Sequence, residues 1–489
     1  MSFKFKSLKR KKIDINCGNN IVFTMLGMGG ANSYLAYELA QIASLSRKRT
    51  DIVMIDTQFV KEDDLKYGKF INKDLGKSRA EVTANRCLAA FDINVETSDK
   101  KISSKEDILK IFKGRMGYFP VIICSNIDEK TVRVLNSALE NISDVLIIMA
   151  KEDIDKGELF VTYKENGIFI TENYVKNYVC NDNSSLNKSC SLEMCKNMFL
   201  YVDDVLCERS ISTEKVLFDI GSKTSVSKYI EGEEAVLNMQ ENKKILVDTN
   251  KDILCIVIGV GGTGGSVAYE VSHIASTSNK NIKIVFIDGD IIETKNLNRQ
   301  RFIIQDLNKY KAEVTAKRCR RAYNVDIVDK NEYVTSEEDI YSIIRAYKGY
   351  TPIILGCSDS LKLRYLVCEA VKNAHKVEGI PEDIIYIDAG NGEDYGQVNF
   401  TYVKNGEYIT PDYFQTSPES LEDVFEAKLV TQMSCDELMN SAPQTKGANM
   451  ASAITMFSYL EDVINEKPIS RYMSYFNNVN RRVESKGII

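Results

Sequence analysis

A glycine-rich turn between a strand and a helix is the first feature of this sequence that could do chemistry. Residues 254–258 (LCIVI) predict a short buried strand, and residues 266–275 predict a helix. Between them stand Gly259, Gly261, Gly262, Gly264 and Gly265. Glycines let the backbone approach phosphate oxygens, and a helix N-terminus offers free N–H groups and a partial positive charge. The turn therefore predicts a phosphate-binding site.

A carboxylate closes the next predicted strand. Residues 282–287 (IKIVFI) run into Asp288, and a carboxylate at this place can accept hydrogen bonds from ribose hydroxyls. The glycine turn and Asp288 together indicate a Rossmann-like nucleotide site. They do not distinguish NAD from ATP.

The residues after Asp288 are more specific. They are Asp290, Asn296, Arg299, Gln300, Lys311 and, after a later predicted strand, Asp359. This order resembles the ThiF, MoeB and ubiquitin-activating enzyme superfamily. Its members carry an Asp-x-Asp, then Asn-Leu-x-Arg-Gln, then a lysine, and an aspartate after a later strand. The resemblance covers nearly all of residues 250–455.

The resemblance implies an adenylyltransferase that activates the C-terminal carboxylate of a ubiquitin-like or sulfur-carrier protein, or of a peptide, with ATP. Asp288 would hold the ribose, and Asn296 and Gln300 the phosphate region. Arg299 and Lys311 would neutralise the triphosphate and the developing charge. Asp359 would ligate Mg²⁺, which usually takes one or two protein carboxylates together with phosphate oxygens. The remaining expected cofactor-binding residues are Gly259, Gly261, Gly262, Gly264 and Asp290.

The chemistry of adenylation suits this residue set. A carboxylate is already ionised at neutral pH, so the reaction requires no general base. It does require charge neutralisation, because an anion must approach a polyanion, and such catalysis is mostly positioning and electrostatic stabilisation. The site should be rich in cations and poor in histidine, and the chain has only 2 histidines.

The elements that position these residues occur twice in the chain. Residues 55–87 align without a gap with residues 287–319, and 15 of the 33 positions are identical. Two shorter matches follow the same order: 26–33 with 258–266, and 157–171 with 396–410. Such a repeat indicates one domain present in two copies.

Each copy is expected to be α/β. In the second copy, residues 352–355 and 384–387 predict further parallel strands, so we expect two tandem Rossmann-like, doubly wound sheet domains. We place the first copy at 1–215, a linker at 216–249 and the active copy at 250–489. Because related enzymes are dimers, we expect the halves to form an internal pseudo-dimer, with a higher oligomer possible.

The first copy retains the fold signals but loses site residues. It keeps Gly27, Gly29, Gly30 and Asp56. Opposite Asp290, Arg299, Gln300, Lys311 and Asp359 stand Gln58, Tyr67, Gly68, Arg79 and Ile127. Asp128 is adjacent to Ile127, so a slipped alignment would restore a carboxylate. We expect the first copy to be a structural half.

The sequence leaves open whether the activated carboxylate is then transferred to a cysteine. Ubiquitin-activating relatives pass the adenylated carboxylate to a cysteine, and Cys435 is the candidate because it opens a predicted helix, where a thiolate would be stabilised. Cys190 stands in a comparable place in the first copy, which favours a packing role instead. The matched Cys87 and Cys319 are expected in the core.

Composition limits the function classes. The 489 residues are 44% hydrophobic and 27% charged, with net charge −6, which weighs against nucleic acid as the main partner. No apolar stretch is long enough to span a bilayer, and no secretory signal is visible, so we expect a cytoplasmic protein without membrane contact. The 12 cysteines include no Cys-x-x-Cys pair, so no zinc is expected.

Two other functions fit part of the pattern. An NAD(P)-dependent oxidoreductase would explain the glycines and Asp288, but it leaves Arg299, Lys311 and Asp359 without a role. A non-catalytic nucleotide-binding scaffold is suggested by the degraded first copy.

Overall fold

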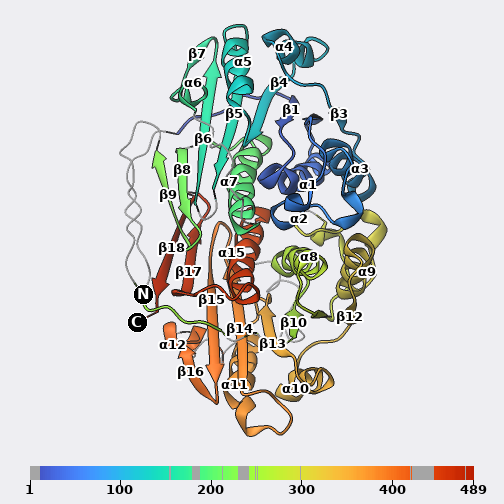
Figure 1. The fold of residues 1–489 in the computed structure, drawn as a ribbon, viewed down its shortest axis with the longest axis vertical. Coiled ribbons are helices and arrows are strands. Elements are labelled where there is room, and N and C mark those ends of the chain that lie inside the picture. Colours follow the sequence, from blue (N-terminus) through green and yellow to red (C-terminus); the bar gives the residue numbers. More distant parts are fainter. Residues whose placement is uncertain are drawn as a thin grey trace. The chain divides into compact units, whose positions relative to one another are not determined.

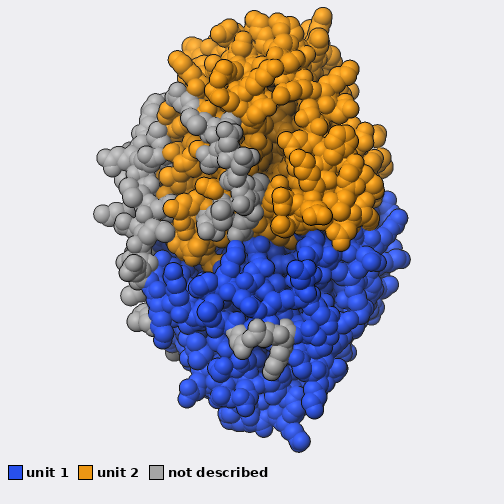
Figure 2. All heavy atoms as spheres, viewed as in Figure 1, with its two compact units in different colours: residues 1–5, 239–479, 483–489 blue, residues 6–238, 480–482 orange. Residues whose placement is uncertain are grey.

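The computed structural model describes residues 12–153, 156–178, 188–211, 213–229, 242–247, 249, 252–297, 299–418, 420, 424, 445–479 and 481–488. The chain divides into two compact units, coloured blue and orange in Figure 2. Unit 1 comprises residues 1–5, 239–479 and 483–489, and unit 2 comprises residues 6–238 and 480–482.

A parallel sheet forms the core of unit 1 (Figure 1). Its central strand, β10 (Ile253–Ile258), pairs in parallel with β11 (Ile282–Ile287) on one side and with β13 (Thr351–Gly356) on the other. Every residue of β10 is buried, as expected for a central strand rich in Ile and Val. The sheet continues through β12 (Ile327–Lys330) beside β11, β14 (Asp383–Asn391) beside β13, and antiparallel β15 (Tyr395–Lys404), which pairs with β16 (Glu407–Thr410) and β17 (Arg471–Asn477). The last strand of the chain is β18 (Arg482–Gly487).

Helices cover both faces of this sheet. Leu254, Ile256 and Ile258 of β10 pack in one core with α10 (Glu337–Ala346) and α11 (Leu361–Asn373). Because strand side chains alternate, the intervening residues face the opposite side. There α8 (Gly262–Thr277) packs against α9 (Lys311–Tyr323) and α15 (Lys446–Ile464), and Figure 1 shows α8 and α15 side by side. The short helices are η2 (Thr294–Asn296), η3 (Ile304–Asp306), η4 (Ala374–Lys376) and α12 (Tyr413–Thr416).

Unit 2 has the same order of strands around its centre. Here β1 (Asn20–Leu26) pairs in parallel with β2 (Arg49–Ile55) and β4 (Phe119–Ser125). The sheet continues through β3 (Glu96–Ser98), β5 (Val145–Glu152), β6 (Lys156–Glu165), β7 (Ile168–Phe169), β8 (Thr213–Asp219) and β9 (Thr224–Tyr229). Its helices are α1 (Gly30–Leu45), α2 (Glu62–Tyr67), η1 (Asn72–Asp74), α3 (Arg79–Phe91), α4 (Lys105–Lys113), α5 (Glu129–Leu139), α6 (Tyr174–Asn177) and α7 (Lys188–Leu206).

The expected doubly wound α/β fold is confirmed in each unit. Cys87 and Cys319 are fully buried, as expected, and their thiols donate to the carbonyl oxygens of Ala36 and Ala268, which stand at matching positions. None of the described helices is long and apolar enough to cross a bilayer.

Two boundaries differ from the sequence prediction. The expected linker at 216–249 begins inside the β8–β9 hairpin, which belongs to unit 2. Its alternation of polar residues with buried Val216 and Phe218 made a one-sided strand resemble a polar linker. Residues 480–482 also belong to unit 2, where the buried Arg481 forms an ion pair with Asp204 at 2.6 Å.

Candidate nucleotide site

The glycine turn of unit 1 lies where the strand order of the sheet reverses. The chain passes from β10 to β11 on one side and later to β13 on the other, and open α/β sheets bind ligands at such a switch point, outside the carboxyl ends of the strands. Gly259 has φ +85°, and a Cβ there would lie 3.1 Å from the carbonyl oxygen of Cys357. The turn therefore lies directly against the loop that follows β13.

Close approaches explain why glycines occupy this turn. A Cβ on Gly264 would lie 1.8 Å from the carbonyl oxygen of Gly259, so the start of α8 packs directly on the turn. The helix begins at Gly262 and not near residue 266, where the sequence had placed its start. A Cβ on Gly261 would lie 3.4 Å from the amide nitrogen of Gln300. Gln300 is thus brought against the turn.

Asp288 is fixed beside the turn by backbone donors. The N–H of Val260 donates to its Oδ2 at 2.6 Å, and the N–H of Asp290 donates to its Oδ1 at 2.9 Å. Burial raises the pKa of Asp288, while the charge of Lys311 and these N–H groups act in the opposite direction. Each carboxylate oxygen keeps a further lone pair that could accept from a ribose hydroxyl.

Lys311 and Asp290 form the charged centre of the site. Lys311 is the first residue of α9, and its Nζ lies 2.6 Å from Oδ2 of Asp290. The hydroxyl of Tyr333 donates to the other oxygen, Oδ1, at 2.6 Å. Burial alone would raise the pKa of Asp290, but Lys311 and the hydrogen bonds from Lys311 and Tyr333 outweigh it and lower the pKa. Asp290 is therefore held as a carboxylate.

Asn296, Arg299 and Gln300 lie on one short segment. Asn296 ends η2, where its Oδ1 accepts from the N–H of Glu293 at 2.8 Å, and its carbonyl oxygen accepts from the N–H of Gln300 at 2.9 Å. Asn296 and Gln300 are buried, and Arg299 is half-buried. The guanidinium of Arg299 forms no ion pair with any residue that the structure describes.

Asp359 lies on the loop between β13 and α11. Its side chain is exposed, and two residues earlier Cys357 touches the glycine turn. Burial raises the pKa of the Cys357 thiol, and the carboxylates of Asp388 and Asp359 raise it further. This argues against a thiolate at Cys357 and indicates that Asp359 is close to it.

The carboxylate arrangement fits a cation bound mainly through phosphate oxygens. Among the described residues, no three or more His, Cys, Asp or Glu side chains are grouped so that they could hold a metal ion alone. Asp359 is a single exposed carboxylate beside the turn, which matches the one or two carboxylates that Mg²⁺ usually takes.

Sequence reasoning missed several contacts of the site. Tyr333 follows β12, a short charged strand that hydropathy did not predict. Asn449 of α15 lies so close to the turn that a Cβ on Gly262 would be 2.2 Å from its amide nitrogen. Asn391, at the end of β14, donates to Oδ1 of Asn449 at 2.9 Å.

The cysteine candidate lies outside the described residues, since Cys435 is not among them. Its assumed counterpart, Cys190, is buried within α7 and donates to the carbonyl oxygen of Lys156 at 3.3 Å. The helices α7 and α15 are both 19 residues long, and each packs on the first helix of its unit. If they are counterparts, Cys190 stands opposite Ala448 and not opposite Cys435.

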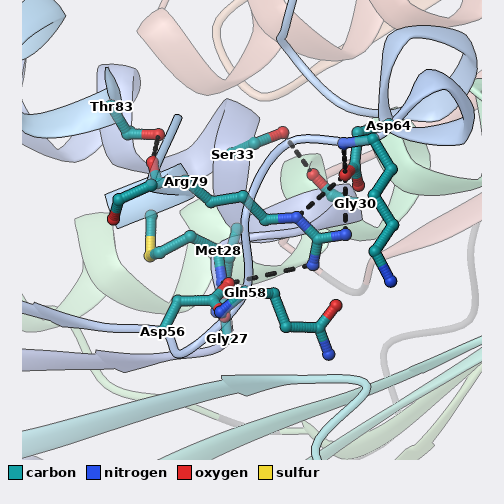
Figure 3. Close-up of polar contacts among 12 residues, drawn as sticks. Gly27, Met28, Gly30, Ser33, Asp56, Gln58, Asp64, Arg79 and Thr83 are labelled. Atoms are coloured by element: carbon teal, nitrogen blue, oxygen red, sulfur yellow. Dashed lines mark hydrogen bonds and ion pairs between the residues drawn. The ribbon is translucent and has the colours of Figure 1, made fainter. Parts of the chain in front are cut away.

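In unit 2 the counterpart of Lys311 is Arg79, and it forms an ion pair with a different carboxylate (Figure 3). Asp56 accepts from the N–H of Met28 at 2.7 Å and of Gln58 at 2.8 Å, as Asp288 does in unit 1. The guanidinium of Arg79, however, donates from Nη2 and Nε to Oδ2 of Asp64 at 2.7 and 2.9 Å. Asp64 is aligned with Asn296 and its side chain is fully buried. The cation of unit 2 is thus neutralised internally.

A second carboxylate of unit 2 lies at the N-terminus of α1. Glu152 accepts from the hydroxyls of Ser125 and Ser191, both at 2.6 Å, and from the N–H of Ala31 at 3.3 Å. Burial raises its pKa, against these donors. At the same place unit 1 has the amide side chains of Asn391 and Asn449, whereas unit 2 has a carboxyl group there.

A slipped alignment does not restore a metal ligand in unit 2. Asp128 is the N-cap of α5, where its Oδ1 accepts from the N–H of Thr131 at 2.7 Å. Ser360 has the same capping role on α11. Asp128 is therefore the counterpart of Ser360, and Ile127 remains the counterpart of Asp359.

A family model matches the part of the chain that contains this glycine turn. The ThiF family matches residues 239–483. Among solved structures, the crystal structure of E. coli MccB with succinimide is similar at 16% identity and a TM-score of 0.34, over 48% of this chain and 64% of that chain. The match thus spans less than two thirds of that protein's length. No curated protein matches this chain in sequence.

Proposed function

This chain belongs to the ThiF family, and we propose that unit 1 is an ATP-dependent adenylyltransferase. Its substrate is the C-terminal carboxylate of a ubiquitin-like or sulfur-carrier protein, or of a peptide. The carboxylate attacks the α-phosphate of ATP, and pyrophosphate leaves. The observation that carries the proposal is the Lys311–Asp290 ion pair, 2.6 Å long, next to Asp288 at the carboxyl edge of the sheet.

The chain's own residues would act by binding and charge neutralisation. The glycine turn and the N-terminus of α8 receive phosphate oxygens, and Asp288 accepts from the ribose. Lys311 and Arg299 stabilise the negative charge that builds on the phosphates. Gln300, which lies against the turn, and Asn296, whose carbonyl oxygen accepts from the N–H of Gln300, orient the phosphate chain. No side chain has to remove a proton, which agrees with the lack of histidine among these residues.

Asp359 would hold Mg²⁺. A bound Mg²⁺ would offset the negative charge of the phosphates. The exposure of Asp359 and its place on the loop beside Gly259 support this role.

In this proposal unit 2 is a second copy of the domain that has lost nucleotide binding. Asp64 neutralises Arg79, and Glu152 places a carboxyl group at the N-terminus of α1. Both would oppose a triphosphate.

Pyrophosphate exchange into ATP tests the proposal. The probe is labelled pyrophosphate with ATP, Mg²⁺ and a small protein ending in Gly-Gly that co-purifies with the chain. We expect exchange by the wild type and a loss of at least about tenfold in Arg299→Ala and Asp359→Asn. Variants that exchange as fast as the wild type would contradict these roles.

The same preparation separates the alternatives. Binding of NAD(H) without ATP would indicate an oxidoreductase. Binding of ATP without pyrophosphate release, with every acceptor tested, would indicate a scaffold. A thioester sensitive to reductant, trapped on the wild type and absent from Cys435→Ala, would extend the reaction to a cysteine step.

A further inference from the structure

Tyr333 is a prominent aromatic residue at the carboxyl edge of unit 1 that the proposed mechanism does not use. It follows β12 and is 52% exposed, although its hydroxyl is engaged with Asp290. Its ring lies against the backbone between Asp288 and Asp290, because a Cβ on Gly289 would be 2.7 Å from two ring carbons. Ring and hydroxyl together tie the Tyr333 side chain to the Asp288–Asp290 segment.

The two oxygens of Asp290 have different partners. Oδ1 accepts from Tyr333 and Oδ2 accepts from Lys311, both at 2.6 Å. A carboxylate with one partner can rotate about χ2, because terminal sp³–sp² torsions are broad. With two donors on opposite oxygens its rotation is restricted. The direction of the Lys311 ammonium therefore depends on Tyr333 through Asp290.

Unit 2 lacks both the tyrosine and the aspartate of this arrangement. Gln58 stands opposite Asp290, and Lys101 stands opposite Tyr333. The strand pairing supports this alignment, because Val53 pairs with Glu96 as its counterpart Val285 pairs with Val328. Lys101 instead lies 3.6 Å from Asp128. The Tyr333–Asp290–Lys311 chain is therefore present only in the unit to which we assign nucleotide binding.

We infer that Tyr333 is a positioning residue for Lys311: by fixing the Asp290 carboxylate, it directs the Lys311 ammonium to the phosphates of the bound nucleotide. The inference rests on the proposed function. It concerns the phosphate end of the nucleotide alone. Tyr333 acts through its hydroxyl, and not as an aromatic surface for the base.

The experiment compares ATP·Mg²⁺ and adenosine as probes, by calorimetry on the full chain. Tyr333→Phe keeps the ring and removes the hydroxyl, so we expect ATP affinity to fall about tenfold, the size of a lost hydrogen bond to a charged group. Adenosine affinity should change by less than about twofold, because adenosine has no phosphate. The matched control is Tyr310→Phe, which alters another exposed tyrosine near the site and should bind both probes as the wild type does.

A double-mutant cycle with Asp290→Ala tests the route of the effect. In that background Tyr333→Phe should change ATP affinity by less than about twofold, because the hydroxyl no longer has a carboxylate to fix. Equal loss of ATP and adenosine binding, unchanged ATP binding, or the same loss in both backgrounds would each overturn the inference. A wild type that binds adenosine nucleotides nowhere would overturn the proposed function as well.

Discussion

Arg79 donates two hydrogen bonds to one oxygen of Asp64, whereas Lys311, at the matching position of unit 1, pairs with Asp290. The two cations begin corresponding helices, α3 and α9. The carboxylate of Asp64 is fully buried, while that of Asp290 is 44% exposed. A buried ion pair contributes to the stability of the fold, because breaking it leaves a buried charge without a partner. In a partly exposed ion pair the cation can leave its carboxylate and bind another anion.

Alanine substitution of Arg79 should therefore mainly lower the stability of the fold, whereas alanine substitution of Lys311 should mainly weaken ATP binding. Arg79→Ala leaves the buried carboxylate of Asp64 without its cation, so we expect a loss of about 3 kcal/mol or more in the free energy of unfolding. The folded fraction should still bind ATP with wild-type affinity. Lys311→Ala should cost only about 1 kcal/mol of stability but weaken ATP binding by at least about tenfold. Urea denaturation and calorimetric ATP titration of both variants check this, and a reversed pattern would refute the assignment of the units.

The glycines of the turn offer a second matched pair. Gly264→Ala would place a Cβ 1.8 Å from the carbonyl oxygen of Gly259, so either α8 or the turn must shift, and we expect a loss of about 3 kcal/mol. Gly265→Ala meets its nearest atom at 3.7 Å, and alanine is the better helix former, so its stability should be unchanged or slightly higher. Thermal unfolding of both variants decides the point, and equal melting temperatures would contradict the close packing.

Asp359 should affect the metal requirement more than the nucleotide itself. Asp359→Asn removes the charge but keeps the shape, so half-saturating Mg²⁺ in pyrophosphate exchange should rise by about tenfold or more. Glu393, on the loop between β14 and β15, serves as a control through Glu393→Gln, which should leave the Mg²⁺ dependence unchanged. If the Mg²⁺ dependence of Asp359→Asn matches that of the wild type, another residue holds the metal.

The raised pKa of Glu152 should make the free energy of unfolding of unit 2 depend on pH. Because its folded-state pKa is raised above the ordinary value of 4.5, its contribution is fully present below that value and is lost as pH rises through the folded pKa. Glu152→Gln imitates the neutral form, and its amide can donate to Ser191. We expect the variant to unfold about 2 °C higher than the wild type near pH 8, with a smaller difference near pH 5.

The control for this experiment is Glu129→Gln on the exposed surface of α5, which should show no such trend. A Glu152→Gln variant that is destabilised most at high pH would reverse the sign and show that the ionised form is the one the fold stabilises.

The sequence predicted the parts of the fold that rest on local hydropathy. The strands β10, β11, β13 and β14 were found because they are continuous apolar runs, which is typical of buried parallel strands. β12 was missed because Ile327 is the one buried residue among its four, and the β8–β9 hairpin was missed because polar residues alternate with buried ones such as Val216 and Phe218. Periodicity in such short strands is too weak to separate them from loops.

The site was predictable only where residue type and spacing carry the information. Asp288 was named from its place at the end of a predicted strand, and Asp290 and Lys311 were named from the resemblance to the ThiF superfamily. The structure brings the three residues together. The contacts of Tyr333, Asn391 and Asn449 depend on which strand ends and helices meet in space, which spacing along the chain does not encode. The role of Asp64 was missed for the same reason, since it depends on the contact that Asp64 makes with the side chain of Arg79.

The central claim is that unit 1 holds a triphosphate and unit 2 does not, and a calorimetric titration of the wild-type chain with ATP·Mg²⁺ tests it most directly. We predict one ATP bound per chain, with an affinity that falls at least about tenfold in Lys311→Ala and is unchanged in the folded fraction of Arg79→Ala. Two ATP molecules per chain, or NAD(H) bound in place of ATP, would contradict the account.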